Sequence, residues 1–214
     1  MTRLVLIRHG ESVSTVERRI GGVRTCGGLS PLGRKQAEAL AARLARTGEI
    51  QADLLVSSTI RRAVETAEII APALGELPIE QIPDLGEHEP GPDCDGMTFD
   101  AFIERYGQPD WSGDPYLVGF PGGETLAGFK HRAATALHLL AAGHEGATIV
   151  VTCHAGVVDA ALRSFLNVSM AGVFELSTTN TSLTELSHNP PRWRLLRYND
   201  AAHLEGLPHE TPHA

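Results

Sequence analysis

The chain has few cysteines, no long apolar run and a deficit of positive charge, and each absence excludes a class of protein. Three scattered cysteines with no CxxC spacing do not suit a disulfide framework, so we expect a reducing compartment and a cytoplasmic protein. No run approaches the roughly 18 apolar residues of a membrane span, and a strand follows Met1 so closely that we expect no signal peptide. The net charge of −8 argues against nucleic acid as a partner.

The order of predicted elements indicates an α/β protein. Apolar runs predict strands at residues 3–8, 53–57, 147–152, 182–187 and 192–198. Helical spacing predicts helices at 31–47, 59–74, 99–106, 124–140 and 156–166. This alternation implies a mostly parallel central sheet covered on both faces, a three-layer α/β/α sandwich. With 214 residues we expect one domain, residues 1–204, and a disordered tail, residues 205–214.

Three predicted strands end in residues that suit an anion. The first ends in Arg8-His9-Gly10, the strand at 147–152 is followed by His154, and Arg62 lies on the first turn of the helix after strand 53–57. In open α/β sheets, ligands bind outside the carboxyl ends of the strands, so these side chains are expected to converge on one crevice. Arginine offers a planar fork of donors, and histidine can be a nucleophile, a base or a ligand. Two arginines and two histidines suit a phosphoryl group.

A series of motifs resembles the histidine phosphatase superfamily, the phosphoglycerate-mutase-like proteins, over essentially the whole chain. The matching segments are Arg8-His9-Gly10-Glu11-Ser12 and residues 29–37, 58–66, 85–87, 121–125, 152–158 and 199–204. The resemblance implies a phosphoglycerate mutase-like fold. It also implies an enzyme that acts on a small phosphomonoester with no cofactor and no metal.

The resemblance gives each strand-end residue a role. His9 would be the nucleophile that forms a phosphohistidine. Arg8, Arg62 and His154 would bind the phosphoryl oxygens and stabilise the charge of the transition state. Glu87 would be the general acid that protonates the leaving alkoxide and then the base that activates water.

The chain departs from the family pattern at two places near the site. Thr15 stands where the family commonly has an asparagine that contacts phosphate; either its hydroxyl donates one hydrogen bond instead, or the contact is lost. The family's Trp-Glu-Gly stretch is replaced by Asp93-Cys94-Asp95-Gly96 with an apparent insertion, which makes Asp93 and Asp95 alternative acids. We expect the surrounding segment, residues 85–123, to cover the substrate.

Other reactive residues have structural interpretations. Arg61, one position from the family's arginine, is expected to be solvated or salt-bridged, and Cys153 to pack as a small apolar thiol. No HExxH or similar spacing occurs, so no metal site is predicted. We expect His203, His209 and His213 to belong to a solvated tail.

Three functions remain open from the sequence. A metal-independent phosphatase leads, because residues 85–123 are compact, whereas a mutase that retains its phosphoryl group tends to have larger covering insertions. The alternatives are a 2,3-bisphosphoglycerate-dependent phosphoglycerate mutase and a catalytically inactive phospho-ligand binding protein, although simple binding needs neither a nucleophile nor an acid. The few basic residues in 85–123 indicate a substrate with little charge beyond its phosphate. An edge strand at 192–198 could pair across a homodimer.

Overall fold

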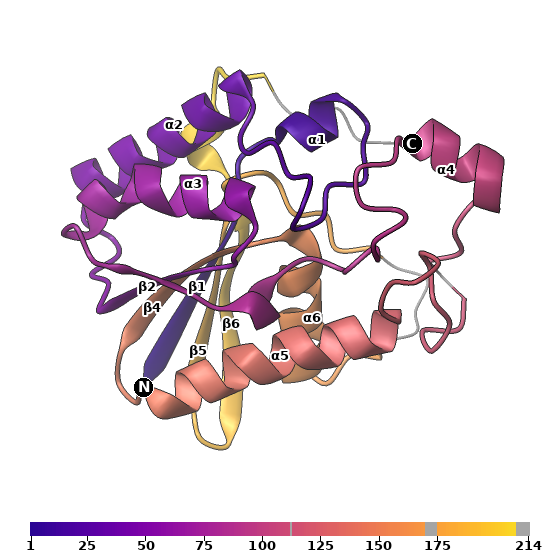
Figure 1. The fold of residues 1–214 in the computed structure, drawn as a ribbon. Helices are drawn as coiled ribbons and strands as arrows, with labels where there is room; N and C mark the ends of the chain where they lie inside the picture. The colour runs from indigo at the N-terminus through magenta and orange to yellow at the C-terminus, as the bar shows by residue number, and fades with distance from the viewer. Residues whose placement is uncertain (112, 170–174, 209–214) are drawn as a thin grey trace.

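A six-stranded sheet in the order β3-β2-β4-β1-β5-β6 forms the middle layer of the described part of the chain, residues 1–111, 113–169 and 175–208 of the computed structural model (Figure 1). The strands are β1 (Thr2–Arg8), β2 (Leu54–Ser57), β3 (Ile79–Gln81), β4 (Thr148–Cys153), β5 (Leu183–Asn189) and β6 (Arg192–Asp200). The first four pair in parallel, whereas β5 runs antiparallel to both β1 and β6. The predicted α/β fold with a mostly parallel sheet is confirmed.

Two pairs of helices cover the two faces of the sheet (Figure 1). They are α2 (Pro31–Thr47) with α3 (Arg61–Ile70), and α5 (Leu126–Gly143) with α6 (Ala155–Phe165). Alternate residues of β1 face opposite layers: Leu4 and Leu6 pack with α5 and α6, whereas Val5 and Ile7 pack with α2 and α3. All four are fully buried, which makes β1 the centre of both cores.

The shorter elements lie between these layers or beside them. They are α1 (Val13–Val16), α4 (Phe99–Tyr106) and the 3-10 helices η1 (Ala71–Leu74), η2 (Pro83–Leu85) and η3 (Ala202–Leu204). Local sequence explains the ends of α2: Ser30 Oγ accepts a hydrogen bond from the Gly33 N–H at 3.0 Å, Pro31 opens the first turn, and Gly48 ends the helix at φ 58°. In the described residues, no helix combines the length and apolar character that crossing a membrane requires.

Several predicted elements differ in detail from the structure. The helix expected over residues 59–74 is divided between α3 and η1, because Pro72 tightens its last turn. Strand β3 was not predicted, since it is only three residues long and lies between Pro78 and Pro83. The predicted edge strand is β6, at the border of the sheet.

The prediction of a solvated His203 is wrong. This residue lies in η3, where its Nε2 is 2.9 Å from Thr181 Oγ1, and burial lowers its pKa to about 4. His209 and His213, and with them most of the predicted disordered tail, lie outside the described residues.

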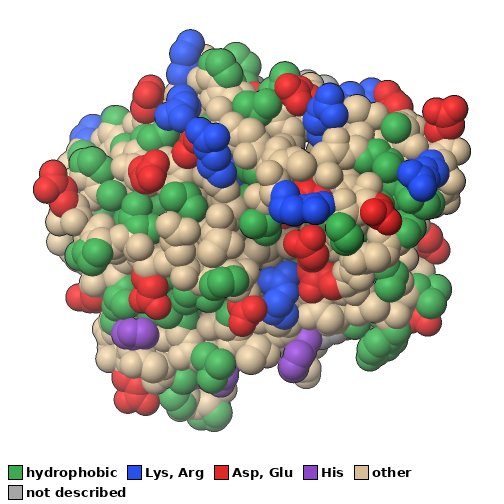
Figure 2. Space-filling view, viewed as in Figure 1, with side chains coloured by type: hydrophobic (Ala, Val, Ile, Leu, Met, Phe, Trp, Pro, Cys, Tyr) green, Lys and Arg blue, Asp and Glu red, His purple; other side chains and the backbone are tan. Residues whose placement is uncertain are grey.

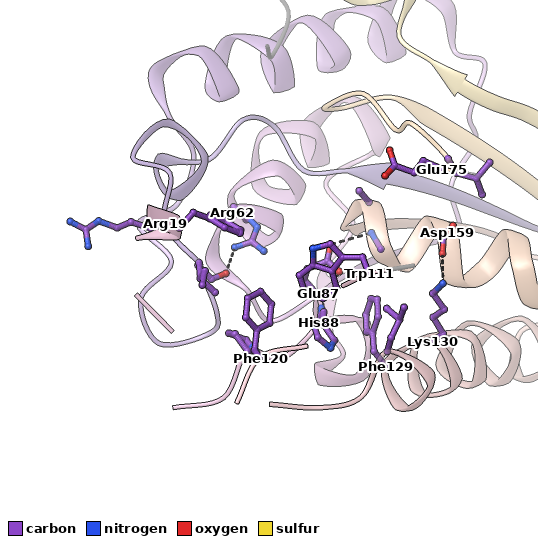
Figure 3. Close-up of a pocket in the computed structure, with 18 of the residues that line it drawn as sticks. Arg19, Arg62, Glu87, His88, Trp111, Phe120, Phe129, Lys130, Asp159 and Glu175 are labelled. Carbon is purple, nitrogen blue, oxygen red and sulfur yellow. Dashed lines mark hydrogen bonds and ion pairs between the residues drawn. The ribbon is translucent and has the colours of Figure 1, made fainter. Parts of the chain in front are cut away.

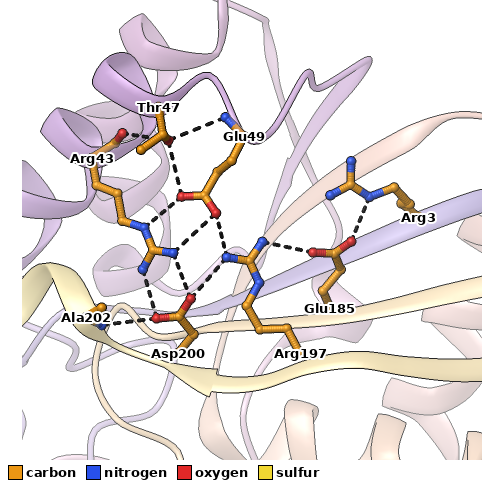
Figure 4. Close-up of polar contacts among 8 residues, drawn as sticks. All are labelled: Arg3, Arg43, Thr47, Glu49, Glu185, Arg197, Asp200 and Ala202. Atoms are coloured by element: carbon orange, nitrogen blue, oxygen red, sulfur yellow. Dashed lines mark hydrogen bonds and ion pairs between the residues drawn. The ribbon is translucent and has the colours of Figure 1, made fainter.

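A network of ion pairs ties the end of α2 to the antiparallel side of the sheet (Figure 4). Its charged members are Arg3, Arg43, Glu49, Glu185, Arg197 and Asp200. Arg43 binds Asp200 through two nitrogens, at 2.9 and 2.7 Å, and its Nε lies 2.7 Å from Glu49. Hydrogen bonds from Arg43, followed by smaller contributions that include Arg197, hold the pKa of Asp200 well below its usual range despite burial. Such paired, fork-shaped contacts are the strong form of a salt bridge.

We expect Asp200→Asn to lower the free energy of unfolding at pH 7 by roughly 2 kcal/mol, because it leaves two partly buried arginines short of a carboxylate. A carboxyl with a depressed folded-state pKa contributes stability above its unfolded pKa, near 4, and loses it as the pH falls through the folded value. The difference between variant and wild type should therefore shrink below about pH 4 in denaturant titrations. Asp100→Asn, which touches only an exposed pair with Arg18, is the control and should change little. A difference that does not depend on pH would contradict this account.

Candidate active site

The pairing of β1 with β4 brings the two predicted histidines together. Arg8 lies opposite Cys153 in the parallel register, and the next N–H, that of His9, donates to the Cys153 carbonyl at 2.9 Å. The rings of His9 and His154 then meet edge to face with their centroids 5.1 Å apart. Both residues are buried, with 5% and 0% of their surface exposed.

The turn after β1 requires glycine because the chain passes directly against the start of α2. A Cβ on Gly10 would overlap the carbonyl oxygen of Gly33, and a Cβ on Gly33 would overlap the backbone of Glu11. This close approach fixes the direction of the chain on both sides of His9. The Asn180 side chain also donates to the His9 carbonyl at 2.9 Å.

Hydrogen bonds define the tautomer of His9. Its Nδ1 lies 2.7 Å from the Gly10 carbonyl oxygen, which only accepts, so Nδ1 carries the hydrogen and Nε2 the lone pair. Arg62 Nε donates to this Nε2 at 3.0 Å. Burial, and then the charges of Arg62 and Arg8, lower the pKa of His9 well below its usual value. The ring is thus neutral, with its lone pair directed to the guanidinium.

His154 has one ring nitrogen with a hydrogen-bond partner and one without, within the described part of the chain. Its Nε2 lies 2.9 Å from Ser58 Oγ, at the end of β2, whereas its Nδ1 is buried with no hydrogen-bond partner among the described residues. Burial, and then the nearby Arg62, lower its pKa as well. If the Ser58 hydroxyl donates to Nε2, Nδ1 carries the hydrogen. A buried donor without a partner is costly, and an oxygen of a bound ligand would satisfy it.

The positive charge of the site is local and mostly buried. Arg62 is 6% exposed and also donates to the Gly21 carbonyl at 2.8 Å, while Arg8 donates to the Thr178 carbonyl. On the face seen in Figure 2, basic and acidic side chains are interspersed. Two guanidinium groups beside two neutral imidazoles make this end of the sheet attractive to an anion.

Glu87 is held at the N-terminus of α6. Its Oε2 accepts the Gly156 N–H at 3.1 Å and its Oε1 accepts the N–H of His88 at 3.0 Å. A Cβ on Gly156 would overlap Glu87 Oε1 and crowd the Phe129 ring. Since Gly156 follows His154 by two residues, one segment positions both the second histidine and the carboxylate.

Two residues fix the loop that carries Glu87: Arg132 on α5, and Glu124 just before that helix. Arg132 donates to the Asp84 carbonyl at 2.7 Å and to Glu124 Oε1 at 2.6 Å, and it also reaches the Glu87 carbonyl. The same Glu124 oxygen accepts the N–H of Glu89 at 2.8 Å. The sequence did not predict that Arg132 positions this loop. Glu124 could be singled out, because it belongs to the Pro-Gly-Gly-Glu motif.

A cavity of about 720 Å³ opens beside these groups (Figure 3). Arg62, Glu87 and Gly156 line one part of it. Arg8, His9 and His154 do not line it, and His9 is linked to it through its hydrogen bond with Arg62. Segment 85–123 supplies several walls, namely His88, Pro90, Phe99, Trp111 and Phe120. The cavity therefore joins the strand-end cluster to the segment predicted to cover a substrate.

The structure separates the alternative acids from Glu87. The carboxylate of Asp95 accepts hydrogen bonds from the N–H groups of Gly22 and Arg24 and from the Thr25 hydroxyl, so it fastens the loop after α1. Burial raises its pKa, but these hydrogen bonds outweigh that effect and the pKa is lowered. Asp93 is exposed, and neither aspartate lines the cavity.

Three further candidates are engaged elsewhere. Thr15 Oγ1 lies 2.9 Å from Ser12 Oγ, the cap of α1, and Thr15 does not line the cavity. Arg61 pairs with Glu65 at 2.8 Å, which confirms the salt-bridged interpretation. Burial raises the pKa of the Cys153 thiol to about 12, as expected for a packing role. Among the described residues, no group of three or more His, Cys, Asp or Glu is arranged to hold a metal ion.

We expect both site histidines to remain neutral at about pH 6, where an unperturbed histidine is mostly protonated, because burial and two arginines disfavour the imidazolium. Proton–nitrogen correlation spectra should report the Nδ1–H tautomer for His9. Assignment would come from the spectra of the His9→Ala and His154→Ala variants. An ordinary titration of either ring, or an Nε2–H tautomer at His9, would contradict the geometry.

Comparisons with known proteins agree with this arrangement. The sequence profile of the histidine phosphatase superfamily (branch 1) matches residues 4–201. Phosphoglycerate mutase-like protein 4 of Arabidopsis thaliana is 32% identical over 205 residues, which cover 94% of this chain and 86% of that protein. The metal-independent phosphoserine phosphatase of the same plant is 29% identical over 212 residues, covering 97% of this chain and 85% of that protein.

A solved structure gives the same result for the fold. Mycobacterial glucosyl-3-phosphoglycerate phosphatase, in complex with VO3, matches with a TM-score of 0.78 at 30% identity and covers 92% of this chain and 98% of its own. The profile match, the identity to full-length relatives and the shared fold extend over nearly the whole chain. The chain therefore belongs to the histidine phosphatase superfamily, and it is a phosphoric monoester hydrolase of that family.

Proposed function

We propose that this enzyme hydrolyses a small phosphomonoester through a phosphohistidine at His9 and without a metal ion. The observation that carries the proposal is the neutral His9 ring, whose Nε2 lone pair faces a guanidinium donor. An imidazole that only binds phosphate would present an N–H there, whereas a nucleophile must present a lone pair.

The geometry supports a two-step reaction. Arg8, Arg62 and His154 Nδ1 bind the phosphoryl oxygens, and the Arg62 Nε–H turns from the His9 ring to the substrate. His9 Nε2 then attacks phosphorus, the P–O bond to the alcohol breaks, and Glu87 gives its proton to the leaving oxygen. In the second step Glu87 takes a proton from water, which attacks phosphorus and releases His9 and inorganic phosphate.

Two arginines provide the charge that a metal ion supplies in other phosphatases. Contacts to the Gly21 and Thr178 carbonyls hold the two side chains in place, so the Arg62 Nε–H is the donor that has to change partner when the phosphoryl group binds. The metal-independent phosphoserine phosphatase among the relatives supports the same chemistry. All three cysteines are free and buried, which supports a reducing, cytoplasmic location.

A phosphoglycerate mutase activity beside hydrolysis is the second candidate, because one relative is named phosphoglycerate mutase-like. The compactness of residues 85–123 favours hydrolysis, because a mutase that retains its phosphoryl group tends to have larger covering insertions. Isomerisation of phosphoglycerate in the presence of 2,3-bisphosphoglycerate would distinguish the two.

The central test is hydrolysis of p-nitrophenyl phosphate in excess EDTA by wild type and by His9→Ala. Removing the nucleophile is expected to lower kcat/KM by about 10³-fold or more. Radiolabelled substrate should leave acid-labile, alkali-stable phosphate on the wild type only. His131→Ala, at an exposed position on α5, is the control and should retain activity. Turnover that survives in His9→Ala would overturn the mechanism.

The role of Glu87 is tested by changing the leaving group. We expect Glu87→Gln to lower kcat/KM for an alkyl phosphate by about 10²- to 10⁴-fold, because an alkoxide must be protonated as it leaves. The loss for p-nitrophenyl phosphate should be much smaller, since nitrophenolate leaves without a proton. Asp93→Asn, at an exposed position, is the matched control. Equal losses for both substrates would exclude Glu87 as the acid.

A further inference from the structure

The cavity is much larger than a phosphoryl group requires. Its volume of about 720 Å³ lies in the range of pockets that enclose ligands of drug size. Arg62 represents the strand-end cluster on one side of it. The other walls come mainly from α5, α6 and the segment of residues 85–123, with residues 19–21 and 175–176 completing the lining. With a phosphate held at Arg62, those walls would contact the leaving alcohol of a substrate, so their chemistry indicates what kind of alcohol fits.

The middle of the cavity is lined by aromatic rings. Phe120 and Phe129 are buried there, and the His88 ring lies 5.6 Å from each of them, centroid to centroid. Trp111 packs 5.1 Å from Phe120 yet remains 46% exposed. An exposed indole next to a cleft has apolar surface that a ligand can cover. A compact, fully polar alcohol would leave this surface in water.

The far end of the cavity contains a buried ion pair. Lys130, on α5, reaches Asp159, on α6, with Nζ 3.1 Å from Oδ2, and its side chain is only 8% exposed. Figure 3 shows this pair on the opposite side of the cavity from Arg62, with Glu87 and the aromatic rings between them.

The carboxylate of Asp159 is shared by two cations. Arg163 Nε also lies 2.8 and 3.0 Å from its two oxygens, so Lys130 shares its carboxylate partner with a second cation. Glu175 is a further carboxylate in the lining of the cavity. Among the described residues, the Lys130 ammonium pairs with Asp159 through one of its three N–H donors. A buried lysine is costly unless its donors are satisfied, and this one lines the cavity. An acceptor on a bound ligand could therefore satisfy a further donor of Lys130.

We propose that the substrate is an elongated phosphomonoester whose leaving group has an apolar or aromatic body and ends, away from the phosphate, in a carboxylate or similar acceptor bound by Lys130. This inference rests on the proposed function, since Arg62 must hold the phosphate for the far end to reach Lys130. It also changes one sequence-based expectation. The small number of basic residues in 85–123 predicted little further charge on the substrate, but Lys130 comes from α5, outside that segment.

The test uses two matched series of substrates in excess EDTA. One series is ω-carboxyalkyl phosphates of increasing chain length, and the other is alkyl phosphates with the same number of carbons. We expect kcat/KM to rise with chain length in both series as the chain covers Trp111. At one length the carboxylate should be preferred over the methyl end by about tenfold or more, the value of a hydrogen bond to a charged group.

Variants assign these effects to residues. Lys130→Met should bring the carboxylate-to-methyl ratio close to one, and Lys130→Gln, which keeps a donor, should retain part of it. Trp111→Ala should flatten the dependence on chain length. The chain's other lysine gives the matched control Lys35→Met on the exposed side of α2, and Tyr116→Ala, 75% exposed, controls for loss of an aromatic side chain. Both controls should keep the wild-type ratios.

Equal rates for the two series at every length, or a preference that persists in Lys130→Met, would overturn the inference. In that case the Lys130–Asp159 pair only joins α5 to α6, and Lys130→Met would lower thermal stability without changing the ratio. Failure of the proposed function would be seen separately, as p-nitrophenyl phosphate turnover that needs metal or survives in His9→Ala.

Discussion

The hydrogen bond from the His9 N–H to the Cys153 carbonyl, at the last step of the β1–β4 ladder, is the contact on which the site depends. This hydrogen bond fixes the register in which β1 and β4 end, and therefore the relative positions of the histidines that follow them. Side chains alternate between the faces of a strand, so a slip of one residue would send Leu4 and Leu6 to the opposite core. Because both faces of β1 are fully buried, such a slip would expose or misplace every apolar side chain of the strand. The core thereby fixes the distance between the two imidazoles.

The same buried position creates the electrostatic character of the site. Neutral imidazoles are favoured because burial and the arginines both oppose protonation of His9 and His154. Arg62 lies buried beside them and donates to a ring lone pair, a carbonyl oxygen and the Cys26 sulfur, and among the described residues it has no hydrogen bond to a carboxylate. A bound phosphoryl group would supply the missing negative charge and also a partner for His154 Nδ1. The cluster is therefore better satisfied with an anion than without one, which is the property expected of a preorganised site.

How much of this the sequence predicts depends on the range of the contacts involved. The strand-end placement of Arg8, His9 and His154 could be predicted because it follows from local apolar runs and from the topology of parallel sheets. The role of Asp95 could not, since its partners are about 70 residues away in the chain. From the sequence alone, Lys130 is one of several polar residues on an amphipathic helix. Its burial results from the packing of α5 against α6. The strand β3 and the contact of His203 with Thr181 were missed for the same reason: short segments acquire their structure from distant neighbours.

Helix α5 would join the proposed catalytic step to the proposed substrate selectivity. Lys130 and Arg132 are two residues apart, so their side chains leave the helix about 200° apart. Arg132 faces the loop that carries Glu87, and Lys130 faces Asp159 on α6. One helix therefore fixes both the carboxyl that would protonate the leaving oxygen and the ammonium at the far end of the cavity. The distance between these groups is set by the backbone of α5 and not by flexible side chains alone. A leaving group of the wrong length would then have to give up either its contact with Lys130 or its alignment with Glu87, so that binding at the far end would act on the rate of the chemical step as well as on affinity.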